Sequence, residues 1–386
     1  MFLSKREHII TLSSIYQLLI RKGHKILIFD ILEESGWFEK GVQYVSLNYN
    51  KPEDVLDYGM GERESIDYLI NMFEQNKIDI VMFSGYSDFL MRVAIASKLM
   101  GIPALHIGSG HRTYNHKDET EVPRQVMDHV VPFHATYTPQ NSRYLLAEGI
   151  GPRYIKLIGC PVVDLVNQRL SEALDKSTIL SEMGVDPGEY IAVVLNKRES
   201  IEFIDGFRSF SSSSGEFLIL PLSKANKKVL IEQDKYYETM SDYDILFMEL
   251  FDYLDHLSFI YNAKSVITDQ EWVALESTVL KRPTTLLISP GSRPFYMQDS
   301  YVNIIPLDES LSKNITNVYM KRKTGDVSRY YGGGGAAEAL SEYLYEVPKL
   351  RLKYPKIGIY SAADGNISQV SKDVIPEKYR RLLSLS

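Results

Sequence analysis

The feature that most constrains this chain is the alternation of uninterrupted apolar runs with stretches of helical periodicity. The run at residues 80–83 is apolar at every position, as in parallel strands that helices cover on both faces. Over residues 9–21 the apolar side chains instead recur at helical spacing, and Gly23 follows where a helix C-cap is expected. Strands that alternate with helices predict a doubly wound parallel sheet.

The alternation forms two series, each long enough for one domain. In the first series, strands are expected at residues 25–29, 78–83, 104–107 and 135–137. In the second series, strands are expected at residues 190–195, 217–220, 264–268, 284–288 and 302–305. A chain of 386 residues is too long for one ordinary core. We therefore predict an α/β fold with two doubly wound Rossmann-like domains that face a central cleft, where ligands of such sheets bind.

The polar helical stretch at residues 165–183 is the expected boundary between the two series. We place an N-terminal domain at residues 1–168 and a C-terminal domain at residues 169–345. Residues 346–386 are expected to form an extension that packs back on the body. The serine run at residues 211–214 reads as a flexible loop, because it lies inside the second series and has the composition of a flexible segment.

Composition excludes several classes of protein. A net charge of −7 and a pI near 5.7 disfavour nucleic acid as a partner, because binding phosphate backbones needs a basic face. The single Cys160 excludes an intrachain disulfide framework and a cysteine zinc site. No stretch has the about 18 uncharged apolar residues that a membrane span needs. We expect a cytoplasmic protein with no metal and no cofactor.

Several short motifs resemble those of one enzyme family in their order and spacing. HIGSGHRT at residues 106–113 resembles HVEAGLRT, and GCPVVD at residues 159–164 resembles GNPVID. Residues 141–150 and 332–337 add two further matches. On these segments the chain is similar to the non-hydrolysing UDP-N-acetylglucosamine (UDP-GlcNAc) 2-epimerases over roughly residues 4–344. The resemblance implies the two-domain GT-B-type architecture, with a sugar-side first domain and a nucleotide-binding second domain.

The resemblance also implies a reaction, the interconversion of UDP-GlcNAc and UDP-N-acetylmannosamine. The C2 proton is lost while UDP is eliminated, and UDP is then re-added with the opposite configuration at C2, which requires carboxylates as acid and base. The family's three acidic positions fall here on Tyr86, Gly108 and Thr120, and its histidine falls on Asn196. The catalytic residues are therefore expected to be substituted. Nearby acid–base groups remain as catalytic candidates, namely Glu121, His111 and Asp88.

On the nucleotide side, the resemblance implies that Glu276 accepts the ribose hydroxyls and that His256 replaces an aromatic ring that stacks on uracil. Lys5 stands for an arginine of the family. The family has DSGG at a helix start, and this chain reads DQEW from Asp269 onward. Gln270 therefore takes the second position of the motif. The third position is an acid, which repels a diphosphate. The expected sugar and phosphate contacts are Arg112, Asn196, Arg198 and Arg293.

Three questions stay open at the level of sequence. Arg112, next to Glu119 and Glu121, fits a substrate clamp or a structural ion pair equally well. The glycines at residues 332–335 fit a phosphate-binding nest or a flexible helix entry, and we favour the helix entry. The protein is expected to be an epimerase-like isomerase with a diverged active site. The alternatives are a non-catalytic relative that binds nucleotide sugars and a GT-B-type glycosyltransferase. Its partner is then a nucleotide sugar, with a homodimer carried over from the family.

Overall fold

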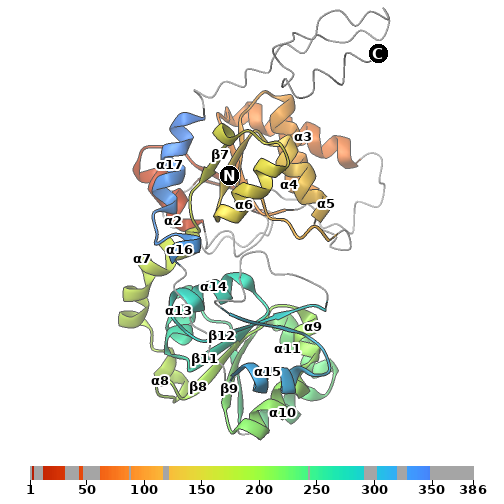
Figure 1. Ribbon diagram of the computed structural model, residues 1–386, viewed down its shortest axis with the longest axis vertical. Helices are drawn as coiled ribbons and strands as arrows, with labels where there is room; N and C mark the ends of the chain where they lie inside the picture. Colours follow the sequence, from red (N-terminus) through yellow and green to blue (C-terminus); the bar gives the residue numbers. More distant parts are fainter. Residues whose placement is uncertain are drawn as a thin grey trace, which may run out of the picture.

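The computed structural model shows an α/β protein with two parallel sheets, each in its own lobe, and confirms the predicted fold class (Figure 1). The structure describes residues 2–3, 12–30, 43–46, 61–86, 88–115, 121–241, 244–290, 302–319 and 328–347. Among these residues, no helix combines the length and the apolar character needed to cross a membrane.

The first lobe is a seven-stranded sheet with the strand order β3-β2-β1-β4-β5-β6-β7. Its strands are β1 (Phe2–Leu3), β2 (Leu27–Asp30), β3 (Gln43–Ser46), β4 (Val81–Ser84), β5 (Ala104–Ile107), β6 (Phe133–Thr136) and β7 (Ile155–Leu157). Its helices are α2 (Ser13–Arg21), α3 (Gly61–Asn76), α4 (Asp88–Leu99), α5 (Glu121–Val130) and α6 (Pro139–Ala147). The side chains of β4, β5 and β6 are buried at every position, which explains their continuously apolar sequences.

The second lobe is a six-stranded sheet with the strand order β10-β9-β8-β11-β12-β13. Its strands are β8 (Tyr190–Val194), β9 (Phe217–Leu222), β10 (Ile245–Glu249), β11 (Ser265–Thr268), β12 (Thr284–Ile288) and β13 (Asn303–Pro306). Its helices are α8 (Ile179–Met183), α9 (Arg198–Glu202), α10 (Ile204–Ser214), α11 (Lys224–Glu232), α12 (Lys235–Met240), α13 (Tyr253–Asn262), α14 (Glu271–Val279) and α15 (Leu311–Tyr319). Both sheets thus share the order of a dinucleotide-binding fold, with one point each where the order reverses.

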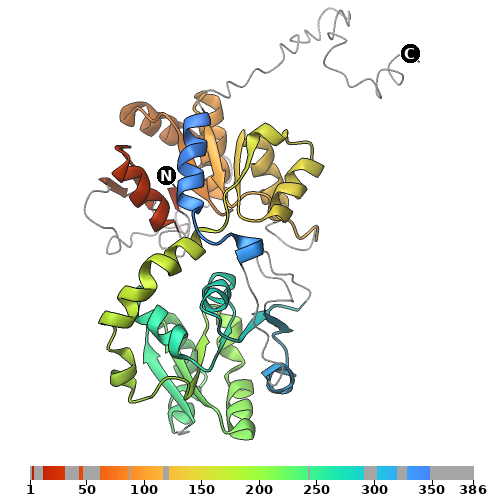
Figure 2. The ribbon, with the colours of Figure 1, turned by 60° about the vertical axis from the view of Figure 1, so that its left-hand side comes forward.

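Two segments connect the lobes (Figure 2). Helix α7 (Pro161–Lys176) leads from the first lobe to the second and packs against α13 and α14. The chain then returns through α16 (Ser328–Tyr331) and α17 (Ala336–Glu346), and α17 packs on α2 of the first lobe. The predicted division after residue 168 lies within α7, and it stays a prediction. Of the predicted extension at 346–386, the residues from 348 onward lie outside the described part of the chain.

The glycine-rich segment at residues 332–335 is a helix entry. Gly335 is the N-cap of α17 with φ +91°, a left-handed conformation that suits glycine. The carboxylate of Asp164 accepts a hydrogen bond from the backbone N–H of Ala337 at 2.9 Å. A protein carboxylate therefore already lies at the N-terminus of α17, where a nest would hold a phosphate.

The prediction of a flexible loop at residues 211–214 is wrong, because these serines form the last turn of α10. Phe207 and Phe210 on the same helix are fully buried and hold it against the sheet. The hydroxyl of Ser214 donates to the carbonyl of Phe210 at 2.7 Å, and Gly215 ends the helix in a left-handed conformation. The buried face therefore outweighs the low helix propensity of a serine run.

Candidate active site

Ligands of doubly wound sheets bind at the carboxyl ends of the strands, near the point where the strand order reverses. In the first sheet this point lies between β1 and β4, and the loop at residues 108–115 leaves the carboxyl end of the next strand, β5. In the second sheet it lies between β8 and β11. Helix α14 follows β11 and lies on the side of the second lobe that faces the first lobe (Figure 1).

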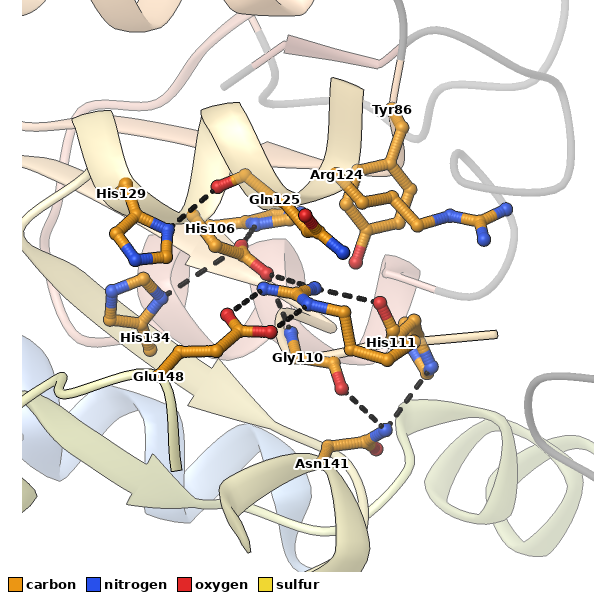
Figure 3. Close-up of polar contacts among 12 residues, drawn as sticks. Tyr86, His106, Gly110, His111, Arg124, Gln125, His129, His134, Asn141 and Glu148 are labelled. Carbon is orange, nitrogen blue, oxygen red and sulfur yellow. Dashed lines mark hydrogen bonds and ion pairs between the residues drawn. The ribbon is translucent and has the colours of Figure 1, made fainter. Parts of the chain in front are cut away.

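A buried carboxylate, Asp128 on α5, organises the loop that follows β5, and Figure 3 labels its neighbours His106, Gly110 and His134. Its Oδ1 lies 2.6 Å from Nδ1 of His106, and its Oδ2 accepts from Nη1 of Arg112 at 2.8 Å. The backbone N–H of Gly110 also donates to Oδ2, at 3.1 Å. Burial alone would raise the pKa of Asp128, but His106, His134 and Arg112 outweigh it and hold that pKa well below its usual range. Asp128 therefore stays charged and ties strand β5 to its loop.

Arg112 is held on two sides by carboxylates. Its Nε and Nη2 donate to the two oxygens of Glu148, each at 2.6 Å, while Nη1 binds Asp128. This is a bidentate pair with a fixed geometry. Among the described residues, Arg112 pairs with Asp128 and Glu148 and not with Glu121, and its guanidinium is buried. A role of Arg112 in binding a sugar or phosphate stays a proposal.

Glu121 is the first residue of α5, and its carboxylate is fully buried. It accepts hydrogen bonds from the backbone N–H of Thr113 at 2.8 Å, from that residue's hydroxyl at 2.9 Å and from the N–H of Tyr114 at 3.1 Å. Burial alone would raise the pKa of Glu121, but these hydrogen bonds and one from Gln125 lower it. Nη1 of Arg124 lies 3.6 Å from Oε2 of Glu121. Glu121 thus holds the loop at residues 113–114 against the start of α5.

The hydrogen bonds around Asn141 define the tautomer of His111. Oδ1 of Asn141 accepts from the backbone N–H and the hydroxyl of Thr138, which places the amide nitrogen on the other side. That nitrogen lies 3.2 Å from Nδ1 of His111 and donates to it, so Nδ1 carries no proton and Nε2 carries one. Burial lowers the pKa of His111 to about 3, so the ring is neutral. His111 is therefore a hydrogen-bond donor through Nε2 and not a base.

We predict that nuclear magnetic resonance of 15N-labelled histidine shows His111 as the Nε2–H tautomer, without titration between pH 5 and 8. The folded-state pKa of about 3 lies below this range, so the neutral ring persists throughout. In Asn141→Asp the carboxylate accepts at Nδ1, and the tautomer should change to Nδ1–H. Asn262→Asp, in the second lobe, is the control that leaves the His111 signals unchanged. Titration of His111 in the wild-type protein near neutrality would contradict the assignment.

The backbone at residue 108, where the resemblance leads us to expect an acidic side chain, lies against an aromatic ring. Gly108 has φ +79°, and a Cβ built on it would lie 2.9 Å from Cζ of the buried Tyr137. The hydroxyl of Tyr86 lies 3.5 Å from the carbonyl of Gly108, and the guanidinium of Arg124 lies 5.1 Å from the Tyr86 ring centroid. No side chain fits at residue 108 unless Tyr137 moves.

In the second lobe, the carboxylate of Asp269 lies at the point where the strand order reverses. It accepts the backbone N–H of Asn196 at 2.9 Å and that of Lys197 at 2.8 Å, directly after β8. Burial raises the pKa of Asp269, against these hydrogen bonds. Two N–H groups at the end of β8 are therefore already satisfied by the protein, while the side chain of Asn196 is exposed.

Helix α14 carries a second buried carboxylate, Glu276. Its Oε1 accepts from the hydroxyl of Tyr253 at 2.8 Å, and its Oε2 lies 3.0 Å from Nε2 of His256. The ring of Trp272 lies 5.6 Å from that of His256, and its Nε1 donates to Oε1 of Gln270 at 2.8 Å. The structure thus brings together three of the predicted nucleotide contacts, Gln270, Glu276 and His256.

Other predicted site residues cannot be placed or stand apart. Lys5, Arg293 and Glu119 lie outside the described residues, and Asp88 is the first residue of α4 but its side chain is also outside them. The exposed Arg198 pairs with Glu202 at 3.0 Å. Among the described residues, no group of three or more metal-binding side chains could hold an ion. Sequence reasoning missed the polar and charged partners that complete both sites, namely Asp128, Glu148, Arg124, Asn141 and Tyr253.

Comparison with known proteins gives one family. A family described as UDP-N-acetylglucosamine 2-epimerase matches residues 47–345. The UDP-N-acetylglucosamine 2-epimerase of Methanocaldococcus jannaschii is 23% identical over 361 residues, which cover 89% of this chain and 97% of that protein. The UDP-N-acetylglucosamine 2-epimerase of Methanococcus maripaludis is 24% identical over 292 residues, which cover 72% of this chain and 79% of that protein.

Solved structures show the same fold. The Methanocaldococcus jannaschii UDP-GlcNAc 2-epimerase in complex with UDP-GlcNAc and UDP has a TM-score of 0.75 at 20% identity, over 89% of this chain and 98% of that chain. The Neisseria meningitidis UDP-GlcNAc 2-epimerase bound to UDP-GlcNAc has a TM-score of 0.73 at 20% identity, with the same coverage of both chains. Because the family match spans well over half of the sequence, this chain belongs to the UDP-N-acetylglucosamine 2-epimerase family.

Proposed function

We propose that this chain is an enzyme that interconverts UDP-GlcNAc and UDP-N-acetylmannosamine. The observation that carries the proposal is the buried carboxylate of Glu276 on α14, beside the rings of His256 and Trp272. A carboxylate can accept both hydroxyls of a ribose, and a neighbouring ring can stack on a planar base. The family match and its relatives, whose solved structures contain UDP-GlcNAc or UDP, agree with this ligand.

In the proposed reaction a base takes the C2 proton, the C1–C2 double bond forms, and the C1–O bond breaks with its electrons leaving on UDP. Re-addition of UDP and delivery of a proton to the other face of C2 give the epimer. Of the three candidate groups, Glu121 holds the loop at residues 113–114 with both oxygens, and His111 is a donor. We therefore propose the remaining candidate, Asp88, as the base. The neutral His111 is suited to donate a hydrogen bond to an oxygen that gains negative charge.

The test is proton nuclear magnetic resonance of UDP-GlcNAc incubated with the protein in deuterated water. Deuterium at C2 together with the mannosamine epimer is the expected result, because the proton removed from C2 exchanges with solvent and a deuteron is then delivered to C2 of the glycal. Free UDP without the epimer would instead indicate hydrolysis or transfer to an acceptor. Unchanged substrate would contradict the proposed turnover.

A second candidate function is binding of a nucleotide sugar without turnover. It is favoured by Tyr137, whose ring fills the volume beside Gly108 where the family's acidic side chain falls. Asp269 also favours this second function, because its carboxylate already accepts hydrogen bonds from two backbone N–H groups at the end of β8. Calorimetric binding of UDP-GlcNAc by a protein that leaves the C2 proton in place would support this second function.

Replacing Glu276 with Ala is expected to weaken UDP binding by about 1–3 kcal/mol, because the ribose hydroxyls lose a charged acceptor. Isothermal titration calorimetry with UDP measures the change. Glu172→Ala is a suitable control, since Glu172 lies on the polar side of α7 in an exposed pair with Lys176 and should leave the affinity unchanged. An unaltered affinity of Glu276→Ala would remove the assignment of this residue to the ribose.

We further propose contacts to the sugar or diphosphate from Arg112, Asn196, Arg198 and Arg293, and contacts to the nucleotide from Lys5. The proposal also includes a cytoplasmic location, a homodimer, and a division into a sugar-side and a nucleotide-binding domain, on the family resemblance alone. Analytical ultracentrifugation tests the homodimer.

A further inference from the structure

The imidazole of His256 has two aromatic neighbours. The Tyr253 ring lies at 6.2 Å between centroids and 28° between planes. The Trp272 ring lies at 5.6 Å and 33°. Nε2 of the imidazole lies 3.0 Å from Oε2 of Glu276.

Both oxygens of Glu276 have a donor from α13. Tyr253 donates its hydroxyl to Oε1 at 2.8 Å, and its pKa is raised well above the usual range by burial and by Glu276, so it keeps its proton. A carboxylate can only accept, so Nε2 of His256 carries a hydrogen and donates it to Oε2. The carboxylate itself has no exposed surface.

A ribose offers hydroxyl donors, and because the side chain of Glu276 has no exposed surface, a hydroxyl reaches its carboxylate only where a covering side chain moves aside. The side chain of His256 is 12% exposed, whereas that of Glu276 is 0% exposed, so the imidazole reaches the surface and the carboxylate does not. Trp272 is anchored separately through its bond to Gln270. Burial raises the pKa of the Tyr253 hydroxyl, whereas the His256 side chain has exposed surface, so His256 is the donor on Glu276 that can move toward solvent.

We propose that His256 determines the nucleotide affinity and the ribose specificity of this site, because its imidazole competes with a ribose hydroxyl for Oε2 of Glu276. The inference rests on the proposed binding of a uridine nucleotide beside Glu276. Binding then breaks one hydrogen bond to the carboxylate and forms another, so the net gain from that hydroxyl is smaller than at a carboxylate without this competitor. A ligand that lacks this hydroxyl leaves His256 in place and loses correspondingly less affinity.

The test compares UDP binding by wild type, His256→Phe and His256→Gln, measured by isothermal titration calorimetry. Phenylalanine retains a ring beside those of Tyr253 and Trp272 but has no donor, so UDP should bind about tenfold more tightly. Glutamine has an amide donor that reaches the same oxygen, so its affinity should stay within about twofold of wild type. Thermal melting of each variant shows that the fold is intact.

Two deoxy analogues make the test specific to the ribose. One of the two analogues, 2′-deoxy-UDP or 3′-deoxy-UDP, lacks the hydroxyl that replaces His256, and for this analogue the tenfold gain of His256→Phe should vanish. For the other analogue, which retains that hydroxyl, the gain should persist. In a Glu276→Ala background, His256→Phe should give no gain for any ligand. Both results are expected only if the competition occurs at this carboxylate.

The inference and the proposed function fail in different ways. If wild type binds UDP but His256→Phe binds it equally or less tightly with unchanged melting, the competition is overturned and the nucleotide site stands. A gain for His256→Gln as large as that for His256→Phe also overturns it. If neither the wild type nor any variant binds UDP at millimolar concentration, both the inference and the nucleotide site are wrong.

Discussion

Replacing Asp128 with Asn is expected to lower the free energy of unfolding by about 3–5 kcal/mol, because it removes the charge that compensates a buried cation. Arg112 binds this carboxylate at 2.8 Å and His106 lies 2.6 Å from it, and all three side chains are fully buried. An amide cannot accept from both partners and from the N–H of Gly110 with the same geometry. Equilibrium unfolding in urea measures the change.

The control for this prediction is Glu202→Gln, which breaks the pair of Glu202 with Arg198. Both side chains of that pair are largely exposed, so the expected cost is below about 1 kcal/mol. If Asp128→Asn costs no more than this control, the buried cluster is not a main support of the first lobe. The variant should also alter the His111 resonances, because Gly110 connects the Asp128 cluster to Asn141.

The second large effect is expected for Gly110→Ala, at about 2–4 kcal/mol of lost stability. Gly110 has φ +83°, which costs a residue with a side chain about 1–2 kcal/mol. A Cβ would also lie 2.5 Å from the backbone oxygen of Asn141, so either the loop or helix α6 must shift. Because Asn141 holds His111, the shift should reach the candidate active site as well.

Gly101→Ala separates the two contributions to this effect. Gly101 has φ +68° but no atom within 4 Å of an added Cβ, so it carries the conformational cost alone. We expect about 1–2 kcal/mol for this control. Chemical denaturation of both variants measures the difference between them, which reports the contact with Asn141. Equal losses in the two variants would show that the close approach at Gly110 is absorbed without cost.

Much of the fold could be predicted from local sequence. The apolar run at residues 80–83 anticipates β4, and the strands expected in the second series correspond to β8, β9, β11, β12 and β13. Gly23 has φ +86° directly after α2, as its place behind a helical pattern predicts. These successes share a cause, because burial on both faces of a parallel sheet leaves a continuous apolar signal in the sequence.

The serine run at residues 211–214 shows where local reasoning fails. Its composition is that of a flexible segment, yet it forms the last turn of α10. The helix is stabilised by Phe207 and Phe210, whose burial depends on the sheet beneath them. Tertiary packing therefore decided the secondary structure at this position.

The candidate site depended more strongly on the tertiary structure. Motifs in the sequence indicated Glu276, His256 and Arg112, but they did not show what these residues bind. Arg112 has acidic neighbours along the chain, yet its partners are Asp128, 16 residues away, and Glu148, 36 residues away. The Tyr253 and His256 donors lie 23 and 20 residues from Glu276.

The sequence by itself determined two doubly wound sheets and the positions of the chemical groups along the chain, because strand burial and helix periodicity are local properties. Only the tertiary structure decided which carboxylates are already satisfied. Asp128, Glu121, Asp269 and Glu276 all accept hydrogen bonds from within the protein. Such partners are selected by how helices pack on a sheet, and a buried charge must find them wherever they lie in the sequence.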